Sequence, residues 1–361
     1  MQARQVDGMT AASDLHSPHS ADGRFMALDG LRGVAALVVL ILHISSLRHL
    51  VFHGYIAVDL FFIMSGFVMA HAYEGRLRAG WSPGAFIRAR IVRLWPLYIL
   101  GTCIGAAVYA GAINDAGGVI GLGVLFAAAA MMIPTPLDAN SQVFPLNPPG
   151  WSLFFEMAAN IVYAFAASRL SDRALKVVVG LGAAAVLVAF LMAEEGSIGQ
   201  RGWSLAGGLA RVAFGFPLGL LLHRMWIAGR LTLRWPVALI VAAFIAMVVA
   251  PDLGRWNGLA DAVAVLFVLP FIVVAAVTAR LSPRLQTAAA FLAALSYPLY
   301  ILHGPFLMVA KMQFCDVPLS EIIAGAACLV AAFVAGRWFD PPARALLGRM
   351  LQQRRRAPLT A

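Results

Sequence analysis

Ten long apolar runs limit the folds that this chain can adopt. The runs lie near 31–50, 55–73, 94–113, 151–168, 175–193, 206–223, 235–251, 258–278, 287–310 and 319–337. Each is long enough for a helix that crosses about 30 Å of hydrocarbon. The chain is also 61% hydrophobic and only 12% charged, with a mean hydropathy of +0.83, which lies outside the range of soluble domains. The sequence therefore predicts an all-α polytopic membrane protein with ten transmembrane helices.

An eleventh apolar run, 117–133, is rich in Gly and Ala and leads into a Pro-rich loop. If this run does not cross the membrane and the N-terminus is cytoplasmic, most of the 27 Lys and Arg residues fall on the cytoplasmic side, as the positive-inside rule requires. If the run crosses, every later basic loop changes side and the bias is lost. We therefore predict that 117–133 is re-entrant or interfacial and that both termini are cytoplasmic.

Composition divides the chain into a polar, disordered cytoplasmic tail (1–24), a transmembrane domain (25–342) and a basic cytoplasmic tail (343–361). The net charge of +10 comes from short arginine clusters between apolar runs, which indicates membrane topology rather than nucleic-acid binding. The three cysteines lie in or beside apolar runs without metal-ligand spacing, so we expect neither a disulfide framework nor a metal site.

The first run places a cation and an imidazole on one helix face. Arg32 and His43 are eleven residues apart in LDGLRGVAALVVLILHI. This spacing returns to the same face within about 20° and separates the two groups by roughly 16 Å along the helix axis. Ionisable groups are costly in hydrocarbon and usually face a bundle interior or a wet cavity. His43 is therefore a functional candidate; the alternative is a histidine that only hydrogen-bonds a neighbouring helix.

Six ionisable side chains from six predicted helices fall in the outer third of the membrane in this topology. At about 1.5 Å per residue, the first three lie roughly 7 to 10 Å below the outer surface. The six are His43, Asp59, Glu156, Arg211, Asp261 and His303. Singly, each is explained by an interhelical hydrogen bond or by a side chain that reaches the membrane surface. Together they predict one polar layer for acid-base chemistry.

A basic segment, EGRLRAGWSPGAFIRARIVRLWP, lies on the opposite, cytoplasmic side. Part of its charge serves membrane topology. Arg90 and Arg93 are three positions apart on a predicted helix, so their guanidinium groups share a face and suit a phosphate. An anion site roughly 15 to 20 Å from an acid-base layer fits acyl-coenzyme A, which carries phosphates at one end and a thioester at the other.

The chain resembles the acyltransferase 3 family of integral membrane O-acyltransferases over roughly 28–342. The resemblance rests on ALDGLRGVAALVVLILH, GYIAVDLFFIMSGF, FIRARIVRLWPLY, WSLFFE and LSYPLYILHGP, in this order. Arg32 and His43 fit the family motif of an arginine, ten residues and a histidine, and Arg90 and Arg93 fit its arginine-x-x-arginine motif. Near its end the family often has a glutamate before a proline, where this chain has Asp340 in FDPPAR.

The resemblance implies transfer of an acyl group, commonly acetyl, from cytoplasmic acyl-CoA to a hydroxyl of a glycan or lipid-linked acceptor. Acyl-CoA is then a co-substrate, no resident cofactor is expected, and the bilayer of a bacterial inner membrane surrounds the protein. His43 is expected to act as a general base or as a nucleophile that carries the acyl group, and both routes stay open.

The remaining predicted site residues have supporting roles. Asp59 and Glu156 are catalytic candidates that orient the imidazole or bind acceptor hydroxyls. Arg32, Arg90 and Arg93 are expected to bind the acyl-CoA phosphates, and the alternative for Arg32 is an ion pair with Asp29. The candidates for acceptor binding are Tyr297, Tyr300, His303 and Arg211.

The main alternative function is a transporter or flippase of a glycan or lipid precursor. Such a protein is expected to show inverted repeats, paired broken helices or a nucleotide-binding motif. The sequence shows no GxxxxGK[ST] motif and no visible repeat, and its predicted polar layer is near the outer face rather than the membrane centre. The other large superfamily of membrane O-acyltransferases also uses an intramembrane histidine but lacks this arginine-to-histidine spacing. These differences favour the acyltransferase 3 family.

Overall fold

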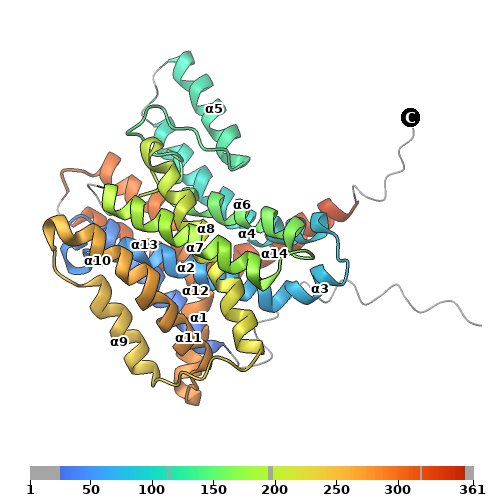
Figure 1. The fold of residues 1–361 in the computed structure, drawn as a ribbon. Coiled ribbons are helices and arrows are strands. Elements are labelled where there is room, and N and C mark those ends of the chain that lie inside the picture. Colours follow the sequence, from blue (N-terminus) through green and yellow to red (C-terminus); the bar gives the residue numbers. More distant parts are fainter. Residues whose placement is uncertain (1–24, 112, 114, 194–197, 318, 354–361) are drawn as a thin grey trace, which may run out of the picture.

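The fold is a bundle of helices, seen in a computed structural model that describes residues 25–111, 113, 115–193, 198–317 and 319–353 (Figure 1). Every regular element in these ranges is helical, as predicted. The α-helices are α1 (Met26–His43), α2 (Ala57–Met69), α3 (Gly75–Arg78), α4 (Pro83–Ala110), α5 (Ala116–Ala130), α6 (Gly150–Ala166), α7 (Asp172–Met192), α8 (Leu205–Ile227), α9 (Val237–Val248), α10 (Asn257–Val263), α11 (Leu269–Thr278), α12 (Pro283–Gln313), α13 (Ser320–Val334) and α14 (Asp340–Gln353).

The helices confirm a multi-pass membrane protein. Within the described ranges, eight helical stretches are long and apolar enough to cross a membrane. Each of the ten predicted runs contains a helix, but α6 and α9 have only 17 and 12 residues. The count of ten crossing helices therefore stays a prediction. The predicted tail 343–361 begins inside α14, and the predicted tail 1–24 lies outside the described residues.

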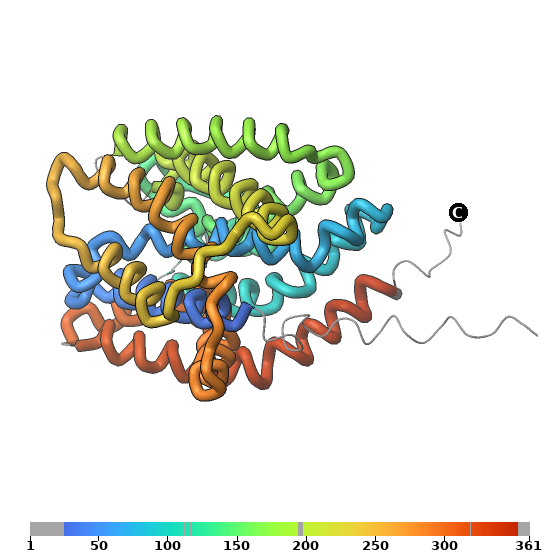
Figure 2. The backbone as a smooth tube through the Cα atoms, turned by 60° about the horizontal axis from the view of Figure 1, so that its bottom comes forward, coloured from blue at the N-terminus to red at the C-terminus, as the bar shows by residue number. Residues whose placement is uncertain are grey.

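Helix α1, which carries Arg32 and His43, packs against α12, and the two helices run in the same direction. Gly30 lies beside Ala289, and Gly33 lies beside Leu292. A Cβ atom at Gly33 would come within 2.4 Å of the Leu292 Cβ atom, so glycine is what permits this close approach. Figure 2 shows α7 along one edge of the bundle and α13 with α14 along the opposite edge, with α1 and α2 between them.

Helix α2 packs closely against α8 through the small residues of the MSGF segment. A Cβ atom at Gly66 would lie 2.0 Å from the backbone oxygen of Phe216, so a larger residue would push the two helices apart. Close helix packing of this kind is common where small residues meet in membranes. The preceding residue, Ser65, points its side chain elsewhere, into the cavity described below.

Helix α5 corresponds to the eleventh apolar run and stands apart from the bundle (Figure 1). Its 15 residues span roughly 22 Å, less than a hydrocarbon core of about 30 Å. Its C-terminal end is tied to α4, because Tyr98 Oη donates to the Ala129 carbonyl (2.7 Å) and Trp95 Nε1 donates to the Ala130 carbonyl (3.0 Å). The re-entrant or interfacial placement of 117–133 stays a prediction.

Candidate active site

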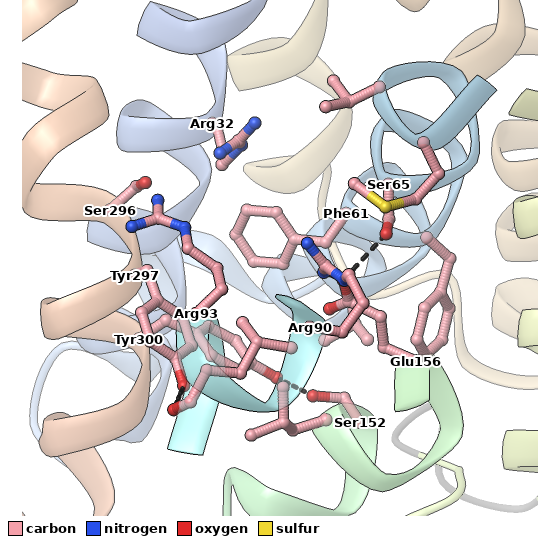
Figure 3. Close-up of a pocket in the computed structure, with 16 residues that line it drawn as sticks. Arg32, Phe61, Ser65, Arg90, Arg93, Ser152, Glu156, Ser296, Tyr297 and Tyr300 are labelled. Carbon is pink, nitrogen blue, oxygen red and sulfur yellow. Dashed lines mark hydrogen bonds and ion pairs between the residues drawn. The ribbon is translucent and has the colours of Figure 1, made fainter. Parts of the chain in front are cut away.

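A cavity lined by three arginines lies between α1, α2, α4, α6 and α12 (Figure 3). Measured as the space open to the centres of water molecules, its volume is about 130 Å³. Its polar lining residues are Arg32, Ser65, Arg90, Arg93, Ser152, Glu156, Ser296, Tyr297 and Tyr300. The structure thus brings together all three residues predicted to bind acyl-CoA phosphates.

The arginines enter this cavity from two helices. Helix α4 begins at Pro83, well before the predicted run at 94–113, because Ser82 caps its N-terminus by accepting a bond from the Ala85 amide. Arg90 and Arg93 are therefore held on a regular helix and reach the same cavity. Arg32 joins them from α1 and forms an ion pair with Asp29 on its own helix at 3.4 Å.

Glu156 on α6 binds Arg90 inside this cavity. Arg90 Nη2 donates to Glu156 Oε1 at 2.8 Å, and Ser65 Oγ donates to the same oxygen at 2.8 Å (Figure 3). The predicted layer that put Glu156 at the level of His43 is wrong in this respect. The reason is the point at which α6 begins. Its first residue, Gly150, packs against the ring of Tyr98, which lies about two helical turns along α4 from Arg90. Glu156, further along α6, therefore reaches the level of Arg90.

A second, smaller cavity contains His43 and His303. Its volume by the same measure is about 30 Å³, and the two imidazole rings lie 4.8 Å apart between centroids. The other lining residues are Val39, Leu42, Tyr55, Val58, Pro148, Pro149, Trp151, Gln200 and Tyr300. His43 and His303 therefore meet at one site, although they are 260 residues apart in the chain.

Each imidazole is oriented by its own helix. His43 Nδ1 lies 2.8 Å from the Val39 carbonyl, and His303 Nδ1 lies 2.6 Å from the Tyr300 carbonyl. A carbonyl oxygen only accepts hydrogen bonds, so both Nδ1 atoms carry the proton and both Nε2 atoms are left as bases. The His43 carbonyl itself accepts a bond from Lys311 Nζ at 3.0 Å, which ties the end of α1 to α12.

The two cavities meet at Val58 and Tyr300, which line both. The order of lining residues is consistent along each helix: Arg32 precedes His43 on α1, and Tyr297 precedes His303 on α12. The arginine cavity and the histidine cavity are therefore stacked along the helix axes. Tyr300 is fixed at their junction, where its hydroxyl and Ser152 Oγ are 2.6 Å apart.

Asp59 and Arg211 form a buried ion pair with each other. Arg211 Nε and Nη2 donate to the two carboxylate oxygens of Asp59 at 2.9 and 2.7 Å, and Arg211 also donates to the carbonyls of Tyr55 and Ile198. Their side chains are 1% and 0% exposed, and neither residue is part of the two cavity linings among the described residues. This contact links α2 to α8, and the predicted roles of Asp59 in catalysis and Arg211 in acceptor binding stay predictions.

Asp261 belongs to a further buried cluster that sequence reasoning missed. His53 Nδ1 lies 2.7 Å from Asp261 Oδ1, and Tyr55 Oη donates to Asp261 Oδ2 at 2.5 Å. Burial opposes protonation of His53, but the hydrogen bond and the charge of Asp261 outweigh burial and raise the pKa of His53. The signal in the sequence was HGYIAVD, which places two polar rings just before the apolar part of the run.

Residues 26–338 match the acyltransferase domain that defines the acyltransferase 3 family. The chain belongs to this family. The match covers both cavities and every residue predicted for the site, and it identifies the protein as an acyltransferase rather than a transporter. The family resemblance inferred from the five sequence segments is therefore confirmed.

Three curated proteins are similar to this chain in sequence. Protein 2 in the picA locus of Rhizobium radiobacter is 38% identical over 186 residues, which cover 46% of this acyltransferase and 94% of that protein. The exopolysaccharide production protein ExoZ of Rhizobium meliloti (strain 1021) is 27% identical over 49% of this chain and 52% of its own length. Acyltransferase MdmB of Streptomyces mycarofaciens is 27% identical over 39% and 38%.

The match to this chain covers about half the length of ExoZ and a smaller share, 38%, of the length of MdmB. No solved structure matches the chain.

Proposed function

We propose that this acyltransferase moves an acyl group, in the first place acetyl, from cytoplasmic acyl-CoA to a hydroxyl of a cell-envelope glycan or lipid-linked saccharide. The observation that carries the proposal is the stacking of an arginine cavity against a histidine cavity, with Tyr300 lining both. One cavity has the charge for an anion, and the other has the bases for acyl transfer.

The donor is assigned to the arginine cavity by charge and by length. Arg32, Arg90 and Arg93 offer planar forks of donors that match phosphate oxygens. From Arg32 to His43 the helix rises roughly 16 Å, so a flexible arm that starts at the arginines is needed to bring a thioester to the imidazole. Acyl-CoA has phosphates, a long arm and a thioester in this order.

His43 is the group that acts on the thioester in this proposal. Its Nδ1 is engaged by the Val39 carbonyl, and its Nε2 is available either to take the proton of an attacking hydroxyl or to attack the thioester carbonyl. General-base assistance typically contributes a factor of about 10² to 10⁴ in rate.

The direction of the helices supports an orientation in the bacterial cytoplasmic membrane with both termini inside. Because α1 and α12 run in parallel, an even number of crossings is required from the start of α1 to the start of α12. Counting α6 and α9 as crossings and α5 as none satisfies this condition and agrees with the positive-inside bias. The arginine cavity then faces the cytoplasm, where acyl-CoA is found.

The acceptor class rests on the relatives. ExoZ is named for exopolysaccharide production, which fits a hydroxylated glycan as the acceptor, and MdmB is named only as an acyltransferase. We place a glycan first because the enzyme is embedded in a membrane.

The donor assignment is tested by comparing three arginine variants in membranes supplied with radiolabelled acetyl-CoA. We expect Arg90→Ala and Arg93→Ala to raise the KM for acetyl-CoA at least tenfold, and Arg88→Ala, on the same helix but outside the cavity lining, to leave it unchanged. The measured quantity is label incorporated into envelope glycans. Equal KM values for all three variants and wild type would refute the assignment.

A further inference from the structure

The histidine cavity holds two bases, whereas a single base is sufficient for direct transfer. His43 and His303 both present Nε2 as the unprotonated ring nitrogen, because each Nδ1 is engaged by a carbonyl of its own helix. His303 is 2% exposed, and its Nε2 has no hydrogen-bond partner among the described residues. A buried acceptor without a partner is costly, so a donor group that enters this cavity would be stabilised by His303 Nε2.

The size of the cavity limits what it holds at one time. With about 30 Å³ open to the centres of water molecules, the histidine cavity is much smaller than the arginine cavity, which has about 130 Å³ by the same measure. The arginine cavity has the room for the donor arm, whereas the small histidine cavity admits few groups beside the imidazoles. The cavity therefore favours alternate occupation, first by the donor and then by the acceptor.

We propose that His43 carries the acyl group and that His303 is a second catalytic base, which takes the proton of the acceptor hydroxyl. This inference rests on the proposed function and assigns the chemical steps within it. The ring centroids lie 4.8 Å apart, so an acyl group on His43 would lie near the ring of His303.

The steps balance without another reactant. His43 Nε2 attacks the thioester carbonyl, the carbon–sulfur bond breaks, and coenzyme A leaves as the thiolate. The acceptor hydroxyl then attacks the acyl carbon while its proton passes to His303 Nε2, and the bond between the acyl carbon and His43 Nε2 breaks. The proton on His303 is finally released and neutralises the thiolate, so the products are the ester and coenzyme A.

The test is acyl labelling of the purified full chain in detergent with radiolabelled acetyl-CoA and no acceptor. We expect His303→Gln to retain up to one covalently bound label per protein and to release coenzyme A, while transfer to glycan falls at least 100-fold. His43→Gln should take up no label. His223→Gln is the matched control, because His223 is similarly buried, at 3% exposure, but lies outside both cavity linings.

The outcomes separate this inference from the proposed function. If wild type transfers label to glycan and His303→Gln transfers it at the wild-type rate, His303 is not a base, although the proposed function stands. If His303→Gln takes up no label while still folded, His303 acts before acylation and the inference is wrong. If wild type transfers nothing from acetyl-CoA, the proposed function itself fails.

A second variant, His303→Ala, tests whether a loss of activity comes from misfolding. His303→Ala removes the ring and leaves space for free imidazole. We expect added imidazole to restore glycan transfer at least tenfold in His303→Ala but not in His43→Ala, since a diffusible base replaces a proton acceptor but not a tethered acyl carrier. Absence of rescue in His303→Ala protein that is still folded would contradict the role of a base.

Discussion

Arg90 and Glu156 are joined by a hydrogen bond of 2.8 Å that links α4 to α6 inside the arginine cavity. The contact orients the Arg90 guanidinium group, and we propose that Glu156 in this way positions Arg90 for the donor phosphates. The side chains are only 9% and 23% exposed, so the bond is not fully screened by solvent.

Removing this anchor should weaken donor binding more than it slows transfer. For Glu156→Ala we expect the KM for acetyl-CoA to rise about tenfold with a smaller change in kcat, since a hydrogen bond to a charged group is worth about 1.5–3 kcal/mol. Ser65→Ala is the matched control, because it removes only the neutral donor to the same carboxylate oxygen and should raise KM less. A large fall in kcat at unchanged KM would instead return Glu156 to the catalytic role expected from the sequence.

The ion pair of Asp59 and Arg211 should matter for stability. Arg211→Met leaves the Asp59 carboxylate buried and unpaired, and breaking a buried pair in this way costs about 3–5 kcal/mol. We expect the double variant Asp59→Leu with Arg211→Met to be more stable than either single variant in unfolding experiments in detergent. Normal stability of Arg211→Met combined with a raised KM for the acceptor would contradict the structural role.

The pair of His53 and Asp261 should make stability depend on pH. Because the pKa of His53 is raised in the folded protein above its ordinary value of 6.5, protonated His53 stabilises the fold. This stabilisation is fully present below pH 6.5 and is lost as the pH rises through the raised pKa.

The measurement is the Tm of wild type and of His53→Gln at a series of pH values that starts below pH 6.5 and rises through the raised pKa of His53. We expect the difference in Tm between the two proteins to be largest at the acidic end and to shrink as the pH rises. A difference in Tm that stays constant with pH, or that grows as the pH rises, would show that His53 is not held in its charged form by Asp261.

The sequence predicted the large features of the fold because hydrocarbon imposes them. Length and hydropathy identify membrane helices without knowledge of packing, and the sequence motifs identify the family, so the multi-pass helical architecture and the family could both be predicted. The spacing of Arg32 and His43 also predicted correctly that the two residues lie on one helix, separated by roughly 16 Å along its axis, since this depends on helix geometry alone.

The partners of each ionisable group could not be predicted in the same way. Depth along a helix gave Glu156 and His43 similar positions, but the start of α6 against Tyr98 shifts Glu156 to the arginines. Depth likewise could not show that the carboxylate of Asp59 is fully engaged by Arg211. Pairing depends on the rotation and vertical offset of neighbouring helices, and one sequence carries no direct signal of either.

The most direct test of the account compares glycan acylation by wild type, His43→Gln and His49→Gln in membranes with equal amounts of protein. His49 is exposed and is only six residues from His43, outside both cavity linings, so it controls for the change of residue type. With radiolabelled acetyl-CoA as donor, we predict that wild type and His49→Gln label envelope glycans equally and that His43→Gln falls at least 100-fold. Equal labelling by all three proteins would contradict the account, because His43 would then have no part in acyl transfer.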